Sequence, residues 1–189
     1  MQAIAVEKAD FRKQLNARRS SLPTGLREQY NGAIHDRLVN LPLINQANSL
    51  FCFISMDNEP ATHPFLKFLL AEGKTLAVPR ILPEKTMIAV ELQDWQSLQP
   101  GELGIMTPAS SQPYSREIDI CITPGLGFTL TGKRLGFGRG YYDKWFSTHR
   151  VGHKIALAYE CQIVDELPVD ENDIPVDMIV TEERIIVIN

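Results

Sequence analysis

Short, continuous apolar runs alternate with helical patterns along most of this chain, and this alternation limits the folds that it can adopt. Residues 49–55 are apolar almost throughout, as expected for a strand that is covered on both faces. Residues 62–72 then place Phe65 and Leu69 on one helical face, and a second strand-like run follows at residues 75–78. Strands that alternate with helices in this way predict an α/β fold with a mostly parallel sheet.

The remaining segments extend the same scheme into one domain. Further helices are predicted over residues 4–19, 25–39 (with Thr24 as the N-cap) and 141–147, and further strands over 87–92, 118–123, 154–159, 178–181 and 184–188, the last two as a hairpin. Residues 93–116 are rich in Pro, Gly, Ser and Gln and are predicted to be a long excursion. A chain of 189 residues can bury a sizeable core, so residues 1–189 are predicted to form a single three-layer domain, a sheet flanked by helices.

Composition excludes several classes of protein. The net charge of −4 argues against a broad nucleic-acid surface, although it is compatible with a local cationic pocket. The N-terminal residues lack the apolar region of a secretory signal, and no apolar run approaches the roughly 20 residues that span a bilayer. The cysteines, Cys52, Cys121 and Cys161, are odd in number and have no metal-ligand spacing, which favours free thiols in a reducing compartment. We therefore expect a cytoplasmic monomer without a nucleic-acid or membrane partner.

The segment with the most chemistry is the glycine-rich stretch 132–143, GKRLGFGRGYYD. Glycines allow backbone N–H groups to approach a ligand, and successive N–H groups form concave anion sites. Lys133, Arg134 and Arg139 supply charged donors for phosphate oxygens. Asp143 is the type of oxygen ligand that holds Mg²⁺ beside phosphates. The stretch predicts a binding site for nucleotide phosphates.

Commoner phosphate motifs do not fit this stretch. Residues 127–133 match the start of a P-loop, but Arg134 stands where a Ser or Thr hydroxyl is needed for Mg²⁺. The spacing of Gly136, Gly138 and Gly140 also differs from the dinucleotide-binding fingerprint. The alternative without a function is a glycine-rich surface hairpin with scattered charges.

Four parts of the chain, in the right order, resemble the 5-formyltetrahydrofolate cyclo-ligase family. They are Lys8 with Arg12, residues 55–59 (SMDNE), residues 124–128 (PGLGF) with 132–143, and residues 171–177. The resemblance extends from about residue 8 to about residue 180, and the glycine-rich motif is its most specific part.

This resemblance implies a fold that sugar-phosphate isomerases and CoA-transferases also use. It implies a ligase that converts 5-formyltetrahydrofolate and ATP, with Mg²⁺, into 5,10-methenyltetrahydrofolate, ADP and phosphate. The implied ATP contacts are Lys8, Arg12, Arg134, Leu135, Gly136, Phe137, Gly138, Arg139, Gly140, Tyr141 and Tyr142. The implied folate contacts are Ile54, Glu59, Phe137, Gly138, Arg139, Gly140 and Tyr141. Arg134 and Arg139 are the implied catalytic residues, and Asp143 and Asp173 the implied Mg²⁺ ligands.

Each of these residues also has an explanation without function. Glu59 can be a solvated carboxylate at a helix start, and Lys8 with Arg12 a solvated helix face. Asp143 can simply pair with Arg139, and Trp95 can belong to the core or to a pocket lid. Two other functions stay open at this point: an isomerase or CoA-transferase-like enzyme, which needs no ATP, and an ATP-sensing module, which has no folate pocket.

Overall fold

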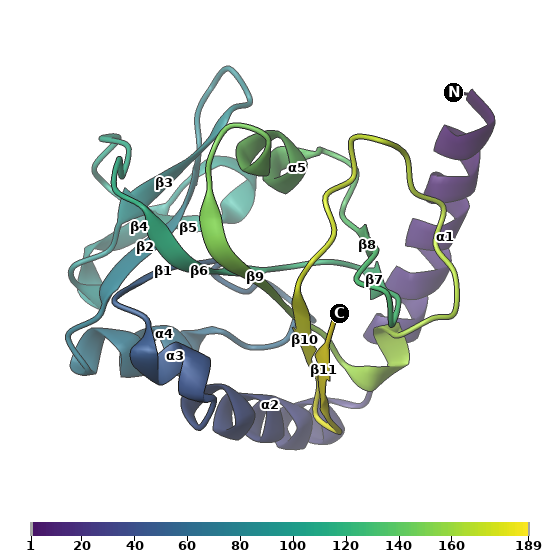
Figure 1. The fold of residues 1–189 in the computed structure, drawn as a ribbon, viewed down its shortest axis with the longest axis horizontal. Coiled ribbons are helices and arrows are strands. Elements are labelled where there is room, and N and C mark those ends of the chain that lie inside the picture. Colours follow the sequence, from purple (N-terminus) through teal and green to yellow (C-terminus); the bar gives the residue numbers. More distant parts are fainter. Residues whose placement is uncertain (1, 189) are drawn as a thin grey trace.

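The computed structural model describes residues 2–188 and shows a seven-stranded sheet with helices on both faces (Figure 1). The helices are α1 (Gln2–Ser20), α2 (Thr24–Val39), α3 (Pro42–Gln46), α4 (His63–Ala71) and α5 (Tyr141–Phe146). The strands of the main sheet are β1 (Ser49–Cys52), β2 (Thr75–Ile81), β3 (Met87–Glu91), β6 (Ile118–Thr123), β9 (Val151–Leu157), β10 (Met178–Val180) and β11 (Ile185–Val187). Two small ribbons, β4 (Leu98–Pro100) with β5 (Met106–Pro108) and β7 (Gly127–Phe128) with β8 (Arg134–Leu135), lie outside it.

The strand order is β11-β10-β9-β6-β1-β2-β3, with antiparallel pairing only at the two edges. The inner pairs β10–β9, β9–β6, β6–β1 and β1–β2 are all parallel. Parallel neighbours need long crossovers, and helices or long loops supply them here. The predicted α/β class and the mostly parallel sheet are therefore confirmed, as is the predicted hairpin of the last two strands.

One face of the sheet is covered by α2, α3 and α4. Their fully buried side chains include Leu38, Ile44 and Leu66, which join a core cluster with the strand residues Leu50 and Ile122. Figure 1 shows these three helices along the lower side of the sheet. Successive strand residues point to opposite faces, so the residues next to these, such as Phe51 and Cys121, point to the other face.

That second face is covered by α5 and the β7–β8 ribbon. Trp145 of α5 packs on Phe51, and Phe128 of β7 packs with residues of β9 and β10. Helix α1 stands beside the β7–β8 ribbon (Figure 1), where Leu15 packs on Leu126 and Leu135. These contacts bring α1 and the glycine-rich segment together on the same side of the sheet, next to β9 and β10.

Several predicted boundaries were wrong. Strand β2 continues through Pro79 to Ile81. Strand β1 pairs only with residues 75–77, so one edge of β2 is unpaired beyond them. Proline, which has no N–H to donate, is tolerated at such an edge. Helix α2 already includes Thr24, so Pro23 is the residue at its N-cap. Strand β1 ends at Cys52, and β9 begins earlier than expected, at Val151.

The segment 93–116 is not a plain loop. It contains the β4–β5 ribbon, and the N–H of Tyr114 donates to the carbonyl of Ala89 on the edge strand β3. Within residues 2–188 no helix is both long enough and apolar enough to cross a membrane. Cys52 and Cys121 are buried and Cys161 is half-buried, all as free thiols.

Candidate functional site

A cavity of about 930 Å³ lies beyond the carboxyl ends of β1 and β6. This is where ligands bind in open α/β sheets. The cavity is lined by residues of α1, of the turn after β1, of the glycine-rich segment and α5, and of the segment 170–173. Of the predicted site residues it brings together Lys8, Arg12, Ile54, Glu59, Arg134, Gly136, Phe137, Gly138, Arg139, Gly140, Tyr141, Tyr142, Asp143 and Asp173.

Leu135 was predicted to contact ATP, but its side chain does not line the cavity. It is buried in a core cluster with Leu15 and Leu126, because alternate residues of β8 point to opposite sides. Lys133, which is exposed, is also absent from the cavity lining.

The glycine-rich loop closes one side of the cavity with backbone that requires glycine. Gly138 has φ +96° and Gly140 has φ +66°, conformations that L-residues rarely adopt. A Cβ on Gly138 would lie 3.3 Å from the Cζ and Nε atoms of Arg12. The Nε of Arg12 in turn donates to the carbonyl oxygen of Gly136 at 2.9 Å. The loop and the first helix are therefore fitted against each other.

Arg134 holds the start of this loop to α5 and to the C-terminal segment. It is 4% exposed, and its Nη2 donates to Oδ1 of Asp143 at 2.5 Å. The same oxygen accepts from the backbone N–H of Ile174 at 3.1 Å. The guanidinium also lies 5.9 Å from the centre of the Tyr142 ring. The partner of Asp143 is thus Arg134, nine residues earlier, and not Arg139 as predicted.

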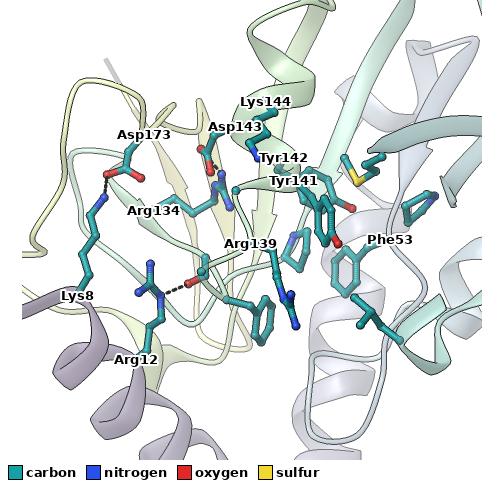
Figure 2. Close-up of a pocket in the computed structure, with 18 of the residues that line it drawn as sticks. Lys8, Arg12, Phe53, Arg134, Arg139, Tyr141, Tyr142, Asp143, Lys144 and Asp173 are labelled. Carbon is teal, nitrogen blue, oxygen red and sulfur yellow. Dashed lines mark hydrogen bonds and ion pairs between the residues drawn. The ribbon is translucent and has the colours of Figure 1, made fainter. Parts of the chain in front are cut away.

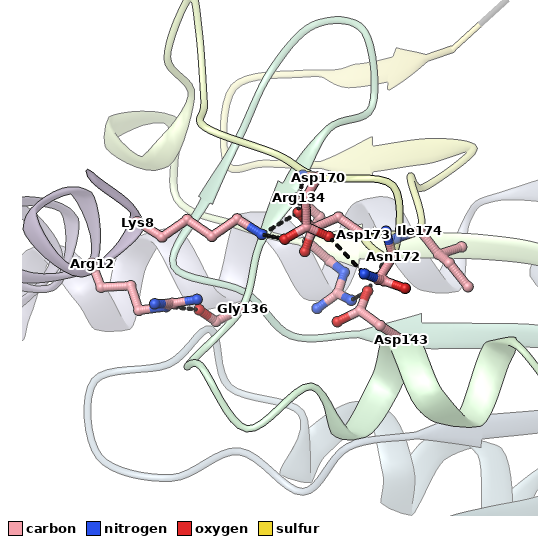
Figure 3. A network of polar contacts seen from close by, with 9 residues as sticks. All are labelled: Lys8, Arg12, Arg134, Gly136, Asp143, Asp170, Asn172, Asp173 and Ile174. Carbon is pink, nitrogen blue, oxygen red and sulfur yellow. Dashed lines mark hydrogen bonds and ion pairs between the residues drawn. The ribbon is translucent and has the colours of Figure 1, made fainter. Parts of the chain in front are cut away.

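Lys8 is a buried residue whose charge is already balanced (Figure 3). Its Nζ donates to Oδ2 of Asp170 at 2.7 Å and also to Oδ2 of Asp173. Burial lowers the pKa of the Lys8 ammonium, but the two carboxylates more than compensate, and the pKa is raised above its usual value. The explanation of Lys8 as part of a solvated helix face is therefore wrong.

Arg139 and Lys144 are two cavity residues whose positive charge is uncommitted. Both side chains are exposed, and neither makes a hydrogen bond or ion pair with any residue in the range 2–188. Figure 2 shows Arg139 between the cationic side of the cavity, with Lys8 and Arg12, and its aromatic side, with Phe53. Lys144 was missed by the sequence analysis. Its position in α5, one residue after Asp143, is the feature of the sequence that could have identified it.

The carboxylates on this side leave oxygens available to a cation. Asp143 and Asp173 each use one oxygen in the contacts above, whereas Oδ2 of Asp143 and Oδ1 of Asp173 accept no hydrogen bond from the described part of the chain. No cluster of three or more His, Cys, Asp or Glu side chains that could hold a metal occurs among residues 2–188. Any cation here would need phosphate oxygens and water as its other ligands.

The opposite end of the cavity is built by the turn after β1. The backbone N–H of Met56 donates to Oε2 of Glu59 at 2.9 Å, and the N–H of Glu59 donates to the carbonyl of Met56. Burial raises the pKa of the Glu59 carboxyl, an effect that the Met56 N–H and the charge of Arg19 partly oppose. Glu59 is therefore neither fully solvated nor at a helix start, since α4 begins only at His63.

Apolar side chains form much of the wall between the two ends. They are Phe53, Ile81, Met87, Leu103 and Ile105. Sequence alone does not mark them as cavity residues, because apolar residues in or near predicted strands are usually core, and because Leu103 and Ile105 come from the excursion 93–116. Trp95, left open between core and lid, does not line the cavity and packs against His63 at 5.2 Å between ring centres.

Tyr141 and Tyr142, predicted to contact ATP, lie between the cavity and the core. Both line the cavity, and both pack against the core cluster around Trp145. The hydroxyl of Tyr142 is buried without a hydrogen-bond partner among the described residues, and its burial raises the pKa of the phenol. This hydroxyl is a polar group without a protein partner at the cavity wall.

Comparison with known proteins identifies relatives along nearly the whole chain. Residues 4–182 match the sequence model of the 5-formyltetrahydrofolate cyclo-ligase family. The 5-formyltetrahydrofolate cyclo-ligase of Escherichia coli strain K12 is 28% identical over 179 residues, with 90% of this chain and 98% of that protein covered. The mouse (Mus musculus) protein of the same name is 28% identical over 203 residues, with 97% and 98% covered.

Solved structures agree. The NMR structure of 5,10-methenyltetrahydrofolate synthetase from Aquifex aeolicus superposes with a TM-score of 0.87 at 30% identity, covering 96% of this chain and 93% of that one. The synthetase from Mycoplasma pneumoniae, at 24% identity and a TM-score of 0.73, shares the fold. These matches favour the ligase over the isomerase and sensor alternatives.

Proposed function

The chain belongs to the 5-formyltetrahydrofolate cyclo-ligase family, and on this basis we propose that the cavity described above binds ATP and 5-formyltetrahydrofolate together, so that ATP drives the cyclisation. It is an ATP-dependent ligase that forms 5,10-methenyltetrahydrofolate, ADP and phosphate. The observation that carries the assignment of residues is that the cation-rich glycine loop and the Glu59 turn line the same cavity.

The reaction needs a better leaving group than a formamide oxygen. The formyl oxygen attacks the γ-phosphorus of ATP, and the bond from that phosphorus to the ADP oxygen breaks. N10 of the folate then attacks the activated formyl carbon and loses its proton. The bond from the formyl carbon to the phosphorylated oxygen breaks, and phosphate leaves with that oxygen. No covalent intermediate on the protein is required, so positioning and charge stabilisation supply the catalysis.

The uncommitted cations are suited to the transferring phosphoryl group. Arg139 and Lys144 have no protein partner within residues 2–188 and can turn to phosphate oxygens without breaking an ion pair. Loop N–H groups around Gly138 add donors. Arg134 contributes mainly by holding the loop to Asp143, and Lys8 by holding the segment of Asp170 and Asp173 against α1. Of the two predicted catalytic residues, Arg139 is the one that we assign to direct phosphate contact.

Mg²⁺ fits the carboxylates on the phosphate side. Mg²⁺ in phosphate sites takes one or two carboxylates and completes its shell with phosphate oxygens and water. The free oxygens of Asp143 and Asp173 provide that number. When bound, the ion would neutralise phosphate charge and fix the orientation of the triphosphate.

The folate lies, in this proposal, along the Glu59 side. Glu59 accepts hydrogen bonds from the N–H groups of the pterin ring, and Ile54 and Phe53 form the apolar wall beside the ring. The formyl group then points to the glycine loop, where Phe137 and Tyr141 border both ligands.

A spectrophotometric assay tests the assignment. Purified protein should generate the near-ultraviolet absorbance of the methenyl product only when ATP, Mg²⁺ and 5-formyltetrahydrofolate are all present. Turnover at the same rate without ATP would contradict the proposal. Omission of Mg²⁺ in the presence of a chelator tests the metal separately, because loss of turnover with retained folate binding is expected.

The cytoplasmic location and the monomeric state are also proposals. Three free thiols are consistent with a reducing compartment. A relative from Arabidopsis thaliana carries a mitochondrial location in its name, so location has to be measured for this chain. Size-exclusion chromatography with light scattering should give the mass of one chain.

A further inference from the structure

A buried arginine that the family resemblance does not account for lies at the folate end of the cavity. Arg19, in the last turn of α1, is 3% exposed and lines the cavity. Its guanidinium donates no hydrogen bond to any residue in the range 2–188, and its Nε and Nη1 atoms are shielded from water without a partner. Burial lowers the pKa of this guanidinium, which the charge of Glu59 partly opposes.

Such an arrangement is costly for the protein alone. Guanidinium groups in protein interiors are normally paired with carboxylates or carbonyls, because an unpaired buried donor loses its hydrogen bonds to water. The neighbouring Arg18, by contrast, is exposed and donates to the carbonyl of Cys161 at 3.3 Å. The guanidinium of Arg19 instead lies 5.4 Å from the ring centre of Phe137, which belongs to the glycine-rich loop. The described residues supply no acceptor for this guanidinium, and its Nη2 is not among the shielded atoms and is the donor open to a ligand.

Glu59 and Arg19 form a complementary pair without touching. They make no ion pair or hydrogen bond with each other, yet the charge of Glu59 is the largest of those that oppose the effect of burial on the pKa of Arg19. Oε2 of Glu59 is used by the N–H of Met56, whereas Oε1 accepts no hydrogen bond from the described residues. This end of the cavity thus offers a free acceptor, Oε1 of Glu59, and a free donor group, Nη2 of Arg19.

The pterin ring presents the matching pattern on one edge. Its 2-amino group and N3–H are donors, and the adjacent C4 carbonyl oxygen is an acceptor. We propose that Arg19 is a specificity-determining residue that donates to the C4 carbonyl oxygen of the folate, while Glu59 accepts from the donors of the same edge. The proposal rests on the proposed function, since it assumes that folate occupies this end of the cavity.

Other acceptors of the two ligands fit this position less well. The glutamate tail of folate carries charged carboxylates, which are best solvated at the mouth of the cavity, and Arg19 is buried. The phosphates of ATP lie, in the proposed function, against Arg139 and Lys144, at the glycine loop and α5. The C4 carbonyl is a neutral acceptor next to the donors that Glu59 accepts from, so it is the group that we assign to Arg19.

A chemical double-mutant cycle tests this pairing. The dissociation constants of 5-formyltetrahydrofolate and of its 4-amino-4-deoxy analogue are measured by calorimetry without ATP, for the wild type and for Arg19→Met. The analogue replaces the acceptor at C4 by a donor and the N3–H donor by an acceptor, and the pH is set where both rings are neutral; the change at N3 affects wild type and variant alike, so the cycle isolates Arg19. The wild type should prefer the 4-oxo compound, Arg19→Met should lose about ten- to a hundred-fold affinity for it, and its affinity for the 4-amino analogue should change less than about three-fold.

Controls separate this role from a structural one. Arg18→Met removes an adjacent surface arginine and should leave both affinities unchanged. Arg19→Lys keeps the charge and one donor, so it should recover part of the 4-oxo preference even if the methionine variant folds poorly. 5-Formyltetrahydropteroate, which lacks the glutamate, should show the same loss in Arg19→Met.

Two results would overturn the proposal. Equal losses of affinity for the 4-oxo and 4-amino ligands would mean that Arg19 stabilises the cavity wall and makes no specific contact with the group at C4. A loss that disappears with the pteroate compound would assign Arg19 to the glutamate tail. If the wild type bound no folate at all, the proposed function itself would fail, and that result is distinguishable from both.

Discussion

Replacing Gly138 by alanine should separate backbone strain from damage to the phosphate site. Gly138 has φ +96°, so an alanine there costs about 1–2 kcal/mol in the folded state whether or not ATP is bound. With a melting shift of about 2–4 °C per kcal/mol for a chain of this size, the strain alone should lower Tm by only a few degrees. The domain should therefore stay folded.

The second effect of the alanine acts on ligand binding. Its Cβ would lie 3.3 Å from Cζ and Nε of Arg12, tighter than an ordinary contact, so the loop or the guanidinium has to move by a few tenths of an ångström. Arg12 is tied to the same loop through the carbonyl of Gly136. Loss of one charged hydrogen bond to a phosphate costs about 1.5–3 kcal/mol, which corresponds to about ten- to a hundred-fold in affinity. We expect the KM for ATP to rise by at least about ten-fold, with little change in folate affinity.

Gly73→Ala is the matched control. Gly73 has φ +69° and does not line the cavity, and a Cβ added there would meet no atom within 4 Å, so the substitution imposes comparable strain without a clash. It should lower Tm to a similar extent and leave ATP kinetics unchanged. If Gly138→Ala behaves like Gly73→Ala in steady-state kinetics, the loop is a surface hairpin and its assignment to ATP is wrong.

Two further predictions concern the carboxylate and the lysine at the two ends of the cavity. Glu59→Gln should weaken folate binding by about ten- to a hundred-fold and leave ATP affinity within about two-fold, because a charged acceptor is lost only at the folate end. If calorimetry shows unchanged folate affinity, Glu59 is a purely structural residue of the turn. Lys8 has a raised pKa, so its stabilising contribution is complete below the unfolded value of about 10.5 and is lost as pH rises through the folded value. The difference in Tm between wild type and Lys8→Met should thus shrink above about pH 10.5, and a difference that is constant with pH would contradict the ion pairs of Lys8.

The fold class could be predicted from the sequence because its signals are local. Apolar runs and helical spacing lie within single segments, and the parallel sheet follows from their alternation. The ends of strands were less predictable, because pairing decides them. The strand was predicted to end before Pro79, yet β2 continues through Pro79, where β1 no longer pairs with it.

The site was predictable where the chemistry is concentrated in a short motif. From Arg134 to Asp143 the glycine-rich stretch lines the cavity as expected, except for Leu135, whose side chain points into the core. Partners distant in sequence were not predictable: no pattern linked Lys8 to Asp170, which lie 162 residues apart. Arg19 was missed because nothing in the sequence distinguishes it from the exposed Arg18, and only the fold buries one of them, beside Phe137.

The central claim is that the two ligands meet in one cavity, so that the formyl oxygen itself receives the phosphoryl group. The most direct test uses 5-formyltetrahydrofolate labelled with oxygen-18 in the formyl group, a single complete turnover with unlabelled ATP in unlabelled water, and mass spectrometry of the phosphate released. Direct transfer predicts that each phosphate formed with product carries one oxygen-18 atom. Phosphate without the label would mean that ATP is hydrolysed separately from cyclisation, and it would contradict the arrangement of the site proposed above.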